Sequence, residues 1–138
     1  MPWEVTLKFV TDPAVFHIVR KSLAAAAVAE GMSRDAASEI EVAVGEALSN
    51  AYIHAYGRDV GPLEIDLASD GARVTILIHD HGKPLTDRPA IPGTLPQRGD
   101  GRGGRGLYLI GRLMDEAEVI HPGPRGRGTA IRMVKRVR

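Results

Sequence analysis

The sequence contains no cysteine, so disulfide bonds, thiolate zinc sites and a cysteine nucleophile are excluded. Long apolar runs are also missing: the longest near the N-terminus, residues 23–29, is alanine-rich and too short to cross a bilayer. No signal-peptide pattern is found, so a cytoplasmic location is expected. The net charge is only +1, which argues against a general attraction to nucleic acids or membranes.

Glycine and proline are abundant, at 16 and 9 of 138 residues, against a typical combined share of about 12%. Residues 82–128 hold 11 of the glycines and 6 of the prolines. Charge is equally uneven: residues 1–96 carry 8 basic and 13 acidic side chains, whereas residues 97–138 carry 10 basic and 4 acidic. The balanced composition therefore conceals a basic, glycine-rich C-terminal third.

Hydrophobic periodicity predicts one domain over residues 1–138. Its fold class is α+β: a two-layer sandwich whose mixed, mostly antiparallel sheet is covered on one face by helices. Asp12 and Ser33 are the expected helix N-caps, and Gly31 and Gly57 the expected helix ends. The predicted elements are strand 3–10, helices 13–30 and 34–56, strands 63–68 and 73–79, loop 80–103, helix 104–114, and strands 117–121 and 129–137.

The loop at residues 80–103 is too long to be a simple connection, so we expect it to be functional. It opens on Asp80 and Gly82 and closes on Gly104, directly before a helix. Glycines at a helix N-terminus let backbone N–H groups approach an anion, and Arg102 and Arg105 add positive charge. The sequence therefore predicts a phosphate site.

Three signatures compete for this site. Residues 101–106 satisfy G-x-G-x-x-G, but the strand that a dinucleotide fold places before these glycines is missing. A P-loop is absent, because the Gly-Lys pair at 82–83 precedes Pro84. Residues 98–106 resemble a short arginine-glycine nucleic-acid segment, but they run into a helix with few aromatics nearby.

The helix at 34–56 carries a carboxylate and an amide on one face, because Glu46 and Asn50 lie four residues apart. Together they suit a general base and a hard-cation ligand. An ordinary solvated polar face would also account for such a pair. The opposite, buried face is expected to comprise Ile40, Val44, Ala47, Leu48 and Ala51.

Four segments in order resemble one family: E-A-L-S-N-A-Y-I-H-A-Y at 46–56, D-H-G at 80–82, G-R-G-L-Y-L-I at 104–110 and G-T at 128–129. They are similar to the N box, the two glycine boxes and the terminal G-T pair of the GHKL (Bergerat-fold) ATPases. Within that superfamily the chain resembles the anti-sigma-factor serine/threonine kinases. The resemblance covers nearly the whole chain.

The resemblance implies ATP and Mg²⁺ as ligands, with a role for each matching residue. Glu46 would be the catalytic base and Asn50 the Mg²⁺ ligand. Asp80 would accept a hydrogen bond from the adenine amino group. Gly82 would let the backbone pass close to the base, and Thr129 would assist adenine binding.

The second glycine box would bind the phosphates through Gly104, Gly106 and Leu107, with the basic residues Arg102 and Arg105 beside them. His54, four residues after Asn50, could reach the phosphates or simply pack. Residues 85–103 would form the ATP lid. Pro84 departs from the family pattern, where a second glycine is common.

The implied function is phosphorylation of a STAS-domain anti-anti-sigma protein, coupled to sequestering a sigma factor. The resemblance also implies a homodimer, with no direct binding to nucleic acid or membrane. A non-catalytic ATP-binding switch that holds a regulatory protein is the alternative. His17 lacks the surroundings of a phospho-acceptor, which argues against a sensor histidine kinase. His79 and His81 straddle Asp80, but the sequence offers no convincing third ligand, so we expect no metal there.

Overall fold

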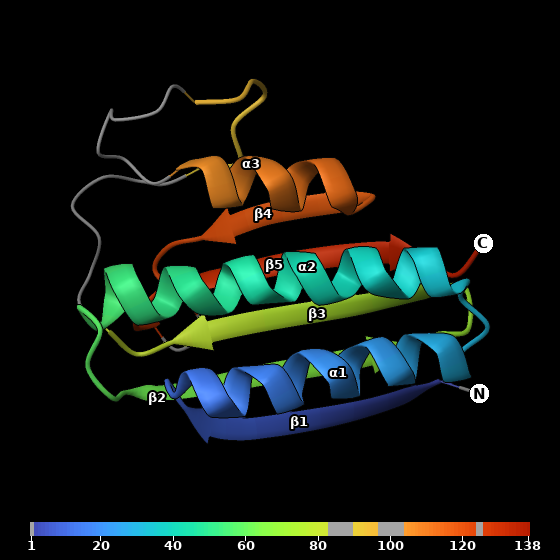
Figure 1. Ribbon diagram of the computed structural model, residues 1–138, viewed down its shortest axis with the longest axis horizontal. Helices are drawn as coiled ribbons and strands as arrows, with labels where there is room; N and C mark the ends of the chain where they lie inside the picture. The colour runs from blue at the N-terminus through green and yellow to red at the C-terminus, as the bar shows by residue number, and fades with distance from the viewer. Residues whose placement is uncertain (1, 83–89, 97–103, 124–125) are drawn as a thin grey trace.

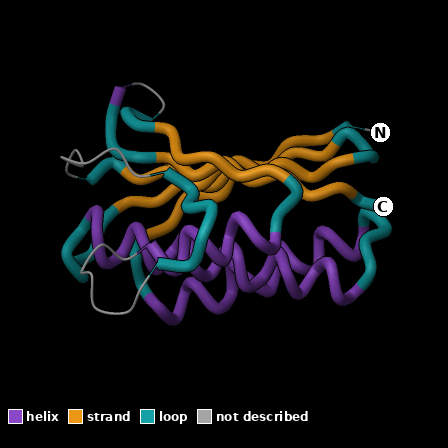
Figure 2. Tube along the Cα trace, turned by 90° about the horizontal axis from the view of Figure 1, so that it is seen from above, coloured by secondary structure: helices purple, strands orange, loops and turns teal. Residues whose placement is uncertain are grey.

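A computed structural model describes residues 2–82, 90–96, 104–123 and 126–138. Its elements form two layers, with the helices on one face of a five-stranded sheet (Figures 1 and 2). This arrangement confirms the expected α+β sandwich. In chain order the elements are β1 Trp3–Val10, α1 Pro13–Ala29, α2 Arg34–Asn50, the π-helical turn Ala51–Ala55, β2 Pro62–Ser69, β3 Arg73–Asp80, α3 Gly104–Leu113, β4 Glu116–Ile120 and β5 Ala130–Arg136.

The sheet has the strand order β1-β2-β3-β5-β4. All four pairings between the described strands are antiparallel, so the parallel component of the expected mixed sheet is not found among them. Two of the four pairings, β2–β3 and β4–β5, join strands that are consecutive in the sheet and along the chain, which favours antiparallel pairing. The other two, β1–β2 and β3–β5, join strands separated by helices and are antiparallel as well. In Figure 1, α1 lies over β1 and β2, α2 over β3 and β5, and α3 over β4.

Side-chain caps begin the two long helices as predicted. The Asp12 carboxylate accepts a hydrogen bond from the Ala14 N–H at 3.0 Å, and the Ser33 hydroxyl accepts one from the Ala36 N–H at 3.1 Å. Each cap satisfies an N–H group that the first turn leaves without a backbone partner. Gly31 follows α1 with a φ of 105°, a conformation that glycine adopts without steric cost.

The core lies between the helices and the inner face of the sheet. Strand residues alternate between faces, so Ile65, Ile76 and Met133 point toward the helices and are fully buried. The buried face predicted for α2 is confirmed, with exposures of 0–6% at Ile40, Val44, Ala47, Leu48 and Ala51.

Lys135 brings a charged group to this inner face and is only 8% exposed. Its ammonium group donates to the Glu39 carboxylate at 3.1 Å and to the Leu113 carbonyl. These bonds connect β5 to α2 and to the end of α3, and they compensate for the burial of the charge.

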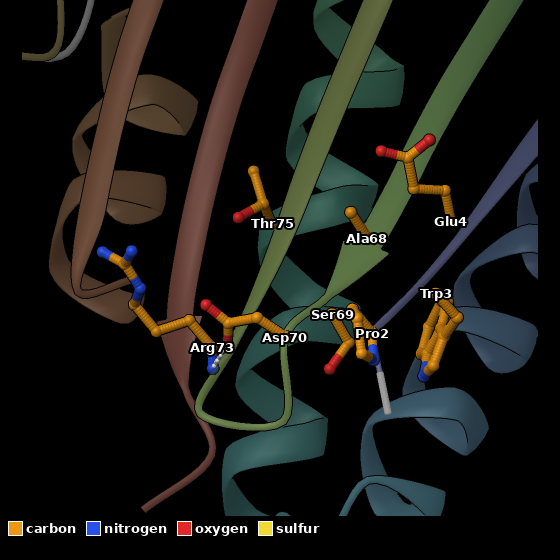
Figure 3. A pocket seen from close by; sticks show the side chains of 8 residues that line it. All are labelled: Pro2, Trp3, Glu4, Ala68, Ser69, Asp70, Arg73 and Thr75. Carbon is orange, nitrogen blue, oxygen red and sulfur yellow. Dashed lines mark hydrogen bonds between the residues drawn. The ribbon is translucent and has the colours of Figure 1, made fainter.

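The hairpin end of the sheet is held by local polar contacts. Glu30, after α1, accepts hydrogen bonds from the Trp3 indole at 2.7 Å and from the Ser69 hydroxyl at 2.6 Å. A shallow hollow lies at this end, beside Trp3, Ser69 and Asp70 (Figure 3). It is remote from Asp80, which is the last residue of β3 and lies at the other end of the strand. Among the described residues, none of the helices combines the length and apolar character that a bilayer crossing requires.

Candidate functional site

Three predicted motifs meet at one end of the two layers. Figure 1 shows that the C-terminal end of α2, the last residue of β3 and the first turn of α3 all lie at the same edge. Gly106 and Gly82 each sit against the N-box segment: a Cβ on Gly106 would lie 2.7 Å from Glu46 Oε2, and one on Gly82 would lie 2.5 Å from the Ala55 carbonyl oxygen. The fold therefore brings together segments that are up to 60 residues apart in sequence.

Asp80 and Thr129 form the buried part of the site, with exposures of 6% and 8%. The Asp80 N–H donates to the Thr129 carbonyl at 3.0 Å, and the Thr129 N–H donates back to the Asp80 carboxylate at 3.3 Å. The same carboxylate oxygen, Oδ1, accepts from the Gly82 N–H at 2.9 Å. These two backbone donors hold the carboxylate in a fixed orientation.

Burial raises the pKa of the Asp80 carboxyl above its ordinary value. The hydrogen bonds from Gly82 and Thr129 oppose this shift, and nearby histidines oppose it more weakly. A buried acid with a raised pKa is costly to keep, and such groups gather at functional sites. The pKa of Asp80 therefore agrees with a recognition role rather than a purely structural one.

Close backbone approach at Asp80 requires glycine at position 128. Gly128 has a φ of 58°, and a Cβ there would lie 2.0 Å from the Asp80 carbonyl oxygen. No side chain fits such a gap without moving the backbone. Gly128 therefore does more than precede Thr129: it lets the segment before β5, which carries Thr129, reach Asp80.

The second helix departs from its predicted form at its C-terminal end. We expect an α-helix to residue 56, but the α-helix ends at Asn50 and a π-helical turn covers Ala51–Ala55. The Tyr56 N–H donates to the Ala51 carbonyl at 3.2 Å, a bond that spans five residues instead of four. Short π-helical segments are rare and are frequent at functional sites.

Tyr56, which follows this turn, joins three parts of the site. Its hydroxyl donates to the Pro62 carbonyl at 2.6 Å and accepts from the His81 N–H at 2.8 Å. The ring packs on Gly61, where a Cβ would lie 2.4 Å away from it. Tyr56 therefore ties the end of the N-box segment to β2 and to the turn that follows Asp80.

The carboxylate of Glu46 lies at the first turn of α3, against Gly106. Glu46 and Asn50 are both half-buried, one helical turn apart on α2. The N-terminal turn of a helix presents free N–H groups and the positive end of its dipole. A phosphate bound at this turn would therefore be close to the Glu46 carboxylate, and Asn50 follows one helical turn further along α2.

The basic side of the site is only partly described. The Arg105 guanidinium donates to the Pro96 carbonyl at 2.9 Å, so it contacts the described part of the expected lid. Within residues 90–96, Ile91 packs on α3 at Gly111, where a Cβ would lie 2.5 Å from Ile91 Cγ2. Residues 85–89 and 97–103, including Arg102, lie outside the described residues.

Two other predicted site residues occupy less direct positions. The Leu107 side chain is 8% exposed and packs in the core, so contact with a nucleotide would fall to its backbone. His54 is exposed on the π-helical turn, and Gly104 is the first residue of α3.

Sequence reasoning missed two contributors to the site. In the sequence Tyr56 is only the last residue of the N-box segment, and nothing there indicates its bridging hydroxyl. No motif includes His121, but its Nδ1 lies 3.2 Å from the Thr129 hydroxyl oxygen. No sequence spacing signals either contact, because both depend on how strands and turns meet in three dimensions.

Comparison with known proteins agrees with this geometry. The family model described as "Histidine kinase-like ATPase domain" matches residues 9–135. The chain is 31% identical over 134 residues to the anti-sigma F factor of Caldanaerobacter subterraneus subsp. tengcongensis, which covers 94% of this chain and 90% of that protein. It is 33% identical over 103 residues to the anti-sigma F factor of Thermoanaerobacter sp. (strain X514), covering 71% and 68%. It is 28% identical over 124 residues to the serine-protein kinase RsbW of Bacillus thuringiensis (strain Al Hakam), covering 86% and 78%.

Proposed function

The chain belongs to the histidine kinase-like ATPase domain family, and from this premise we propose that it is an ATP-dependent protein kinase that acts as an anti-sigma factor. It would transfer the γ-phosphoryl group of ATP to a serine or threonine hydroxyl of a regulatory protein. The observation that carries the proposal is the placement of Glu46 against the first turn of α3.

Glu46 is the proposed general base. Its carboxylate would take the proton from the attacking hydroxyl while the oxygen of that hydroxyl bonds to the γ-phosphorus and ADP leaves. The N–H groups at the start of α3 would stabilise the negative charge on the transferring group. Placement of base and phosphate site on two packed helices supports this division of labour.

Asn50 is the proposed Mg²⁺ ligand. The ion prefers hard oxygen donors, and a carboxamide oxygen one turn from a carboxylate provides that chemistry. When bound, the ion would neutralise charge on the phosphates. The role of Asn50 is to hold it on the α2 side of the site.

Asp80 and Thr129 form the proposed adenine side. The Asp80 carboxylate already accepts two backbone N–H groups through Oδ1, so its other oxygen is the natural acceptor for an exocyclic amino group. The backbone N–H of Thr129 contacts this carboxylate, and the hydroxyl of the same residue can act as donor or acceptor toward the base. Gly82 and Gly128 keep the backbone close on both sides.

The proposed partners follow from the names of the relatives and from the resemblance of the motifs. A sigma factor would be the protein held, and a STAS-domain anti-anti-sigma protein would be the phosphate acceptor. We further propose that the chain acts as a homodimer in the cytoplasm.

The test separates binding from chemistry with one variant. ATP at 100 times its dissociation constant should raise the free energy of unfolding by about 2.7 kcal/mol in the presence of Mg²⁺. Glu46→Gln should retain that stabilisation but lower transfer of labelled phosphate to STAS-domain proteins of the same genome by about 10²–10⁴-fold.

Glu41→Gln is the matched control, because Glu41 lies on the same helix and pairs with Lys21 of α1 at 3.0 Å. Its phosphotransfer should equal that of the unaltered protein. Undiminished transfer by Glu46→Gln would contradict the base assignment. ATP binding without transfer to any STAS-domain protein would instead favour the non-catalytic switch.

A further inference from the structure

The solvent-facing side of the sheet carries two histidines and a carboxylate at the edge of the nucleotide site. His79 lies on the face of β3 opposite to Asp80, since successive strand residues alternate. The strand register pairs His79 with Glu64 of β2. His81 follows Asp80, and its ring lies 5.7 Å from that of His79, centroid to centroid.

We propose that Glu64, His79 and His81 form a binding site for a divalent transition-metal ion of the zinc class. The sequence suggests only two of these ligands. Glu64 is 15 residues from His79 along the chain, and only the antiparallel pairing of β2 with β3 brings it into place. The proposal is independent of the kinase activity.

The distances are close to those of a loaded site. The candidate ligand atoms of the three residues all lie within 4.8 Å of one another, and His79 Nε2 lies 3.6 Å from Glu64 Oε2. Tetrahedral zinc with bonds of about 2.0–2.1 Å separates its ligand atoms by roughly 3.4 Å. Small side-chain rotations therefore suffice to close the site.

The types of ligand in this cluster indicate which metal ion would bind. Two imidazoles and one carboxylate are a common zinc-binding combination, whereas Mg²⁺ and Ca²⁺ prefer all-oxygen surroundings. The His79 ring is 7% exposed, and Asp66 Oδ2 adds a second carboxylate oxygen 3.6 Å from its Nε2. The Thr6 hydroxyl donates to the other oxygen of Asp66 at 2.8 Å, which orients this second carboxylate.

A proton on His79 is the competing occupant, because an imidazolium would pair with the same two carboxylates. The position of His81 favours the metal. The two carboxylates already balance the charge of such an imidazolium without His81, whereas a metal ion would use the second imidazole as a third ligand. Because the two histidines flank Asp80, an occupied site would also restrain the turn that carries that carboxylate.

The test uses tag-free protein, stripped with a chelator and titrated with ZnCl₂ by calorimetry. We expect one zinc ion per chain and a rise in melting temperature that MgCl₂ does not produce. His81→Ala and Glu64→Gln should each weaken zinc binding by about tenfold or more. His17→Ala is the matched control, because His17 is exposed on α1, in the other layer, and should bind as the unaltered protein does.

Cobalt substitution provides a second readout that does not depend on activity. Co²⁺ in the site should give the intense visible absorption of a four-coordinate ion, and His81→Ala should change or abolish that spectrum. The proposal is overturned if zinc does not bind, or if His81→Ala and Glu64→Gln bind it as tightly as His17→Ala does. Circular dichroism of each variant verifies that the fold is retained.

Discussion

Two aspartates, one before strand β3 and one at its last residue, differ in burial and in pKa. Asp70, in the turn before the strand, is exposed, and its carboxylate accepts the N–H groups of Ala72 at 2.9 Å and Arg73 at 2.8 Å. These bonds lower the pKa of Asp70. Asp80, at the end of the strand, also accepts two backbone N–H groups, but burial outweighs them and raises its pKa.

The opposite pKa shifts mean that the ionised carboxylate of Asp70 stabilises the folded state, whereas burying the ionised carboxylate of Asp80 costs stability. At the hairpin end, the exposed Asp70 carboxylate completes a turn, and the folded state favours its ionised form. At the site end, the burial of the Asp80 carboxylate opposes stability, and the close backbone approach leaves no room for a side chain at Gly128. Such an arrangement is typical of a binding site.

The largest expected effect comes from closing the gap beside Asp80. Gly128→Ala should lower the free energy of unfolding by roughly 2 kcal/mol or more and abolish ATP binding, since its Cβ would collide with the Asp80 backbone. Thermal unfolding and calorimetric titration with ATP measure the two effects.

Gly126→Ala is the control for backbone conformation alone. Gly126 also has a positive φ, of 72°, but among the residues that the structure describes a Cβ there meets no atom within 4 Å. Its cost should be about 1 kcal/mol, with ATP affinity retained. Equal effects of the two variants would show that the contact with Asp80 is unimportant.

Asp80→Asn should weaken ATP binding by at least tenfold, about 1.4 kcal/mol, without lowering stability. The amide oxygen can still accept the Gly82 N–H, and the variant removes a buried charge whose raised pKa marks it as unfavourable at neutral pH. ATP titration and chemical denaturation test the two halves separately. Unchanged affinity would remove Asp80 from the adenine site.

Asp70→Asn should give the smallest effect and the reverse pattern, with slightly lower stability at pH 7 and unchanged ATP affinity. The folded pKa of Asp70 is below its ordinary value of 3.8, so its contribution is complete above that pH and is lost as the pH falls through the folded pKa. Melting temperatures of the variant and the unaltered protein should therefore converge as the pH falls below 3.8 and through the lowered pKa of the folded state. A constant difference at every pH would contradict this origin.

Local signals in the sequence were sufficient for most of the fold. The caps at Asp12 and Ser33, the stops at Gly31 and Gly57 and the alternation in β1 act over a few residues, so they can be recognised without tertiary information. The π-helical turn could not be recognised, because no residue pattern in 51–55 distinguishes its five-residue hydrogen bond from the four-residue bond of an α-helix. The burial of Leu107 was equally unpredictable, because its place in the second glycine box suggests contact with a nucleotide, whereas its side chain packs in the core.

The candidate site was predictable as a set of motifs but not as a set of contacts. Order along the chain indicated that Glu46, Asp80 and Gly106 belong together, through resemblance to a family. Their distances, the bridge through Tyr56 and the approach of Gly128 follow from strand pairing and helix packing. Glu64 shows this limit most clearly, since only the register of β2 against β3 places it beside His79.

The contact between Gly106 and Glu46 also couples the substitutions that these two positions can accept during evolution. A descendant that gains any side chain at 106 must displace the carboxylate at 46, whereas one that loses the carboxylate leaves room at 106 for a larger residue. Substitutions at the two positions are therefore not independent. Because this carboxylate ends a flexible side chain, a larger residue at 106 would move it away from the first turn of α3 and so weaken the proposed chemistry.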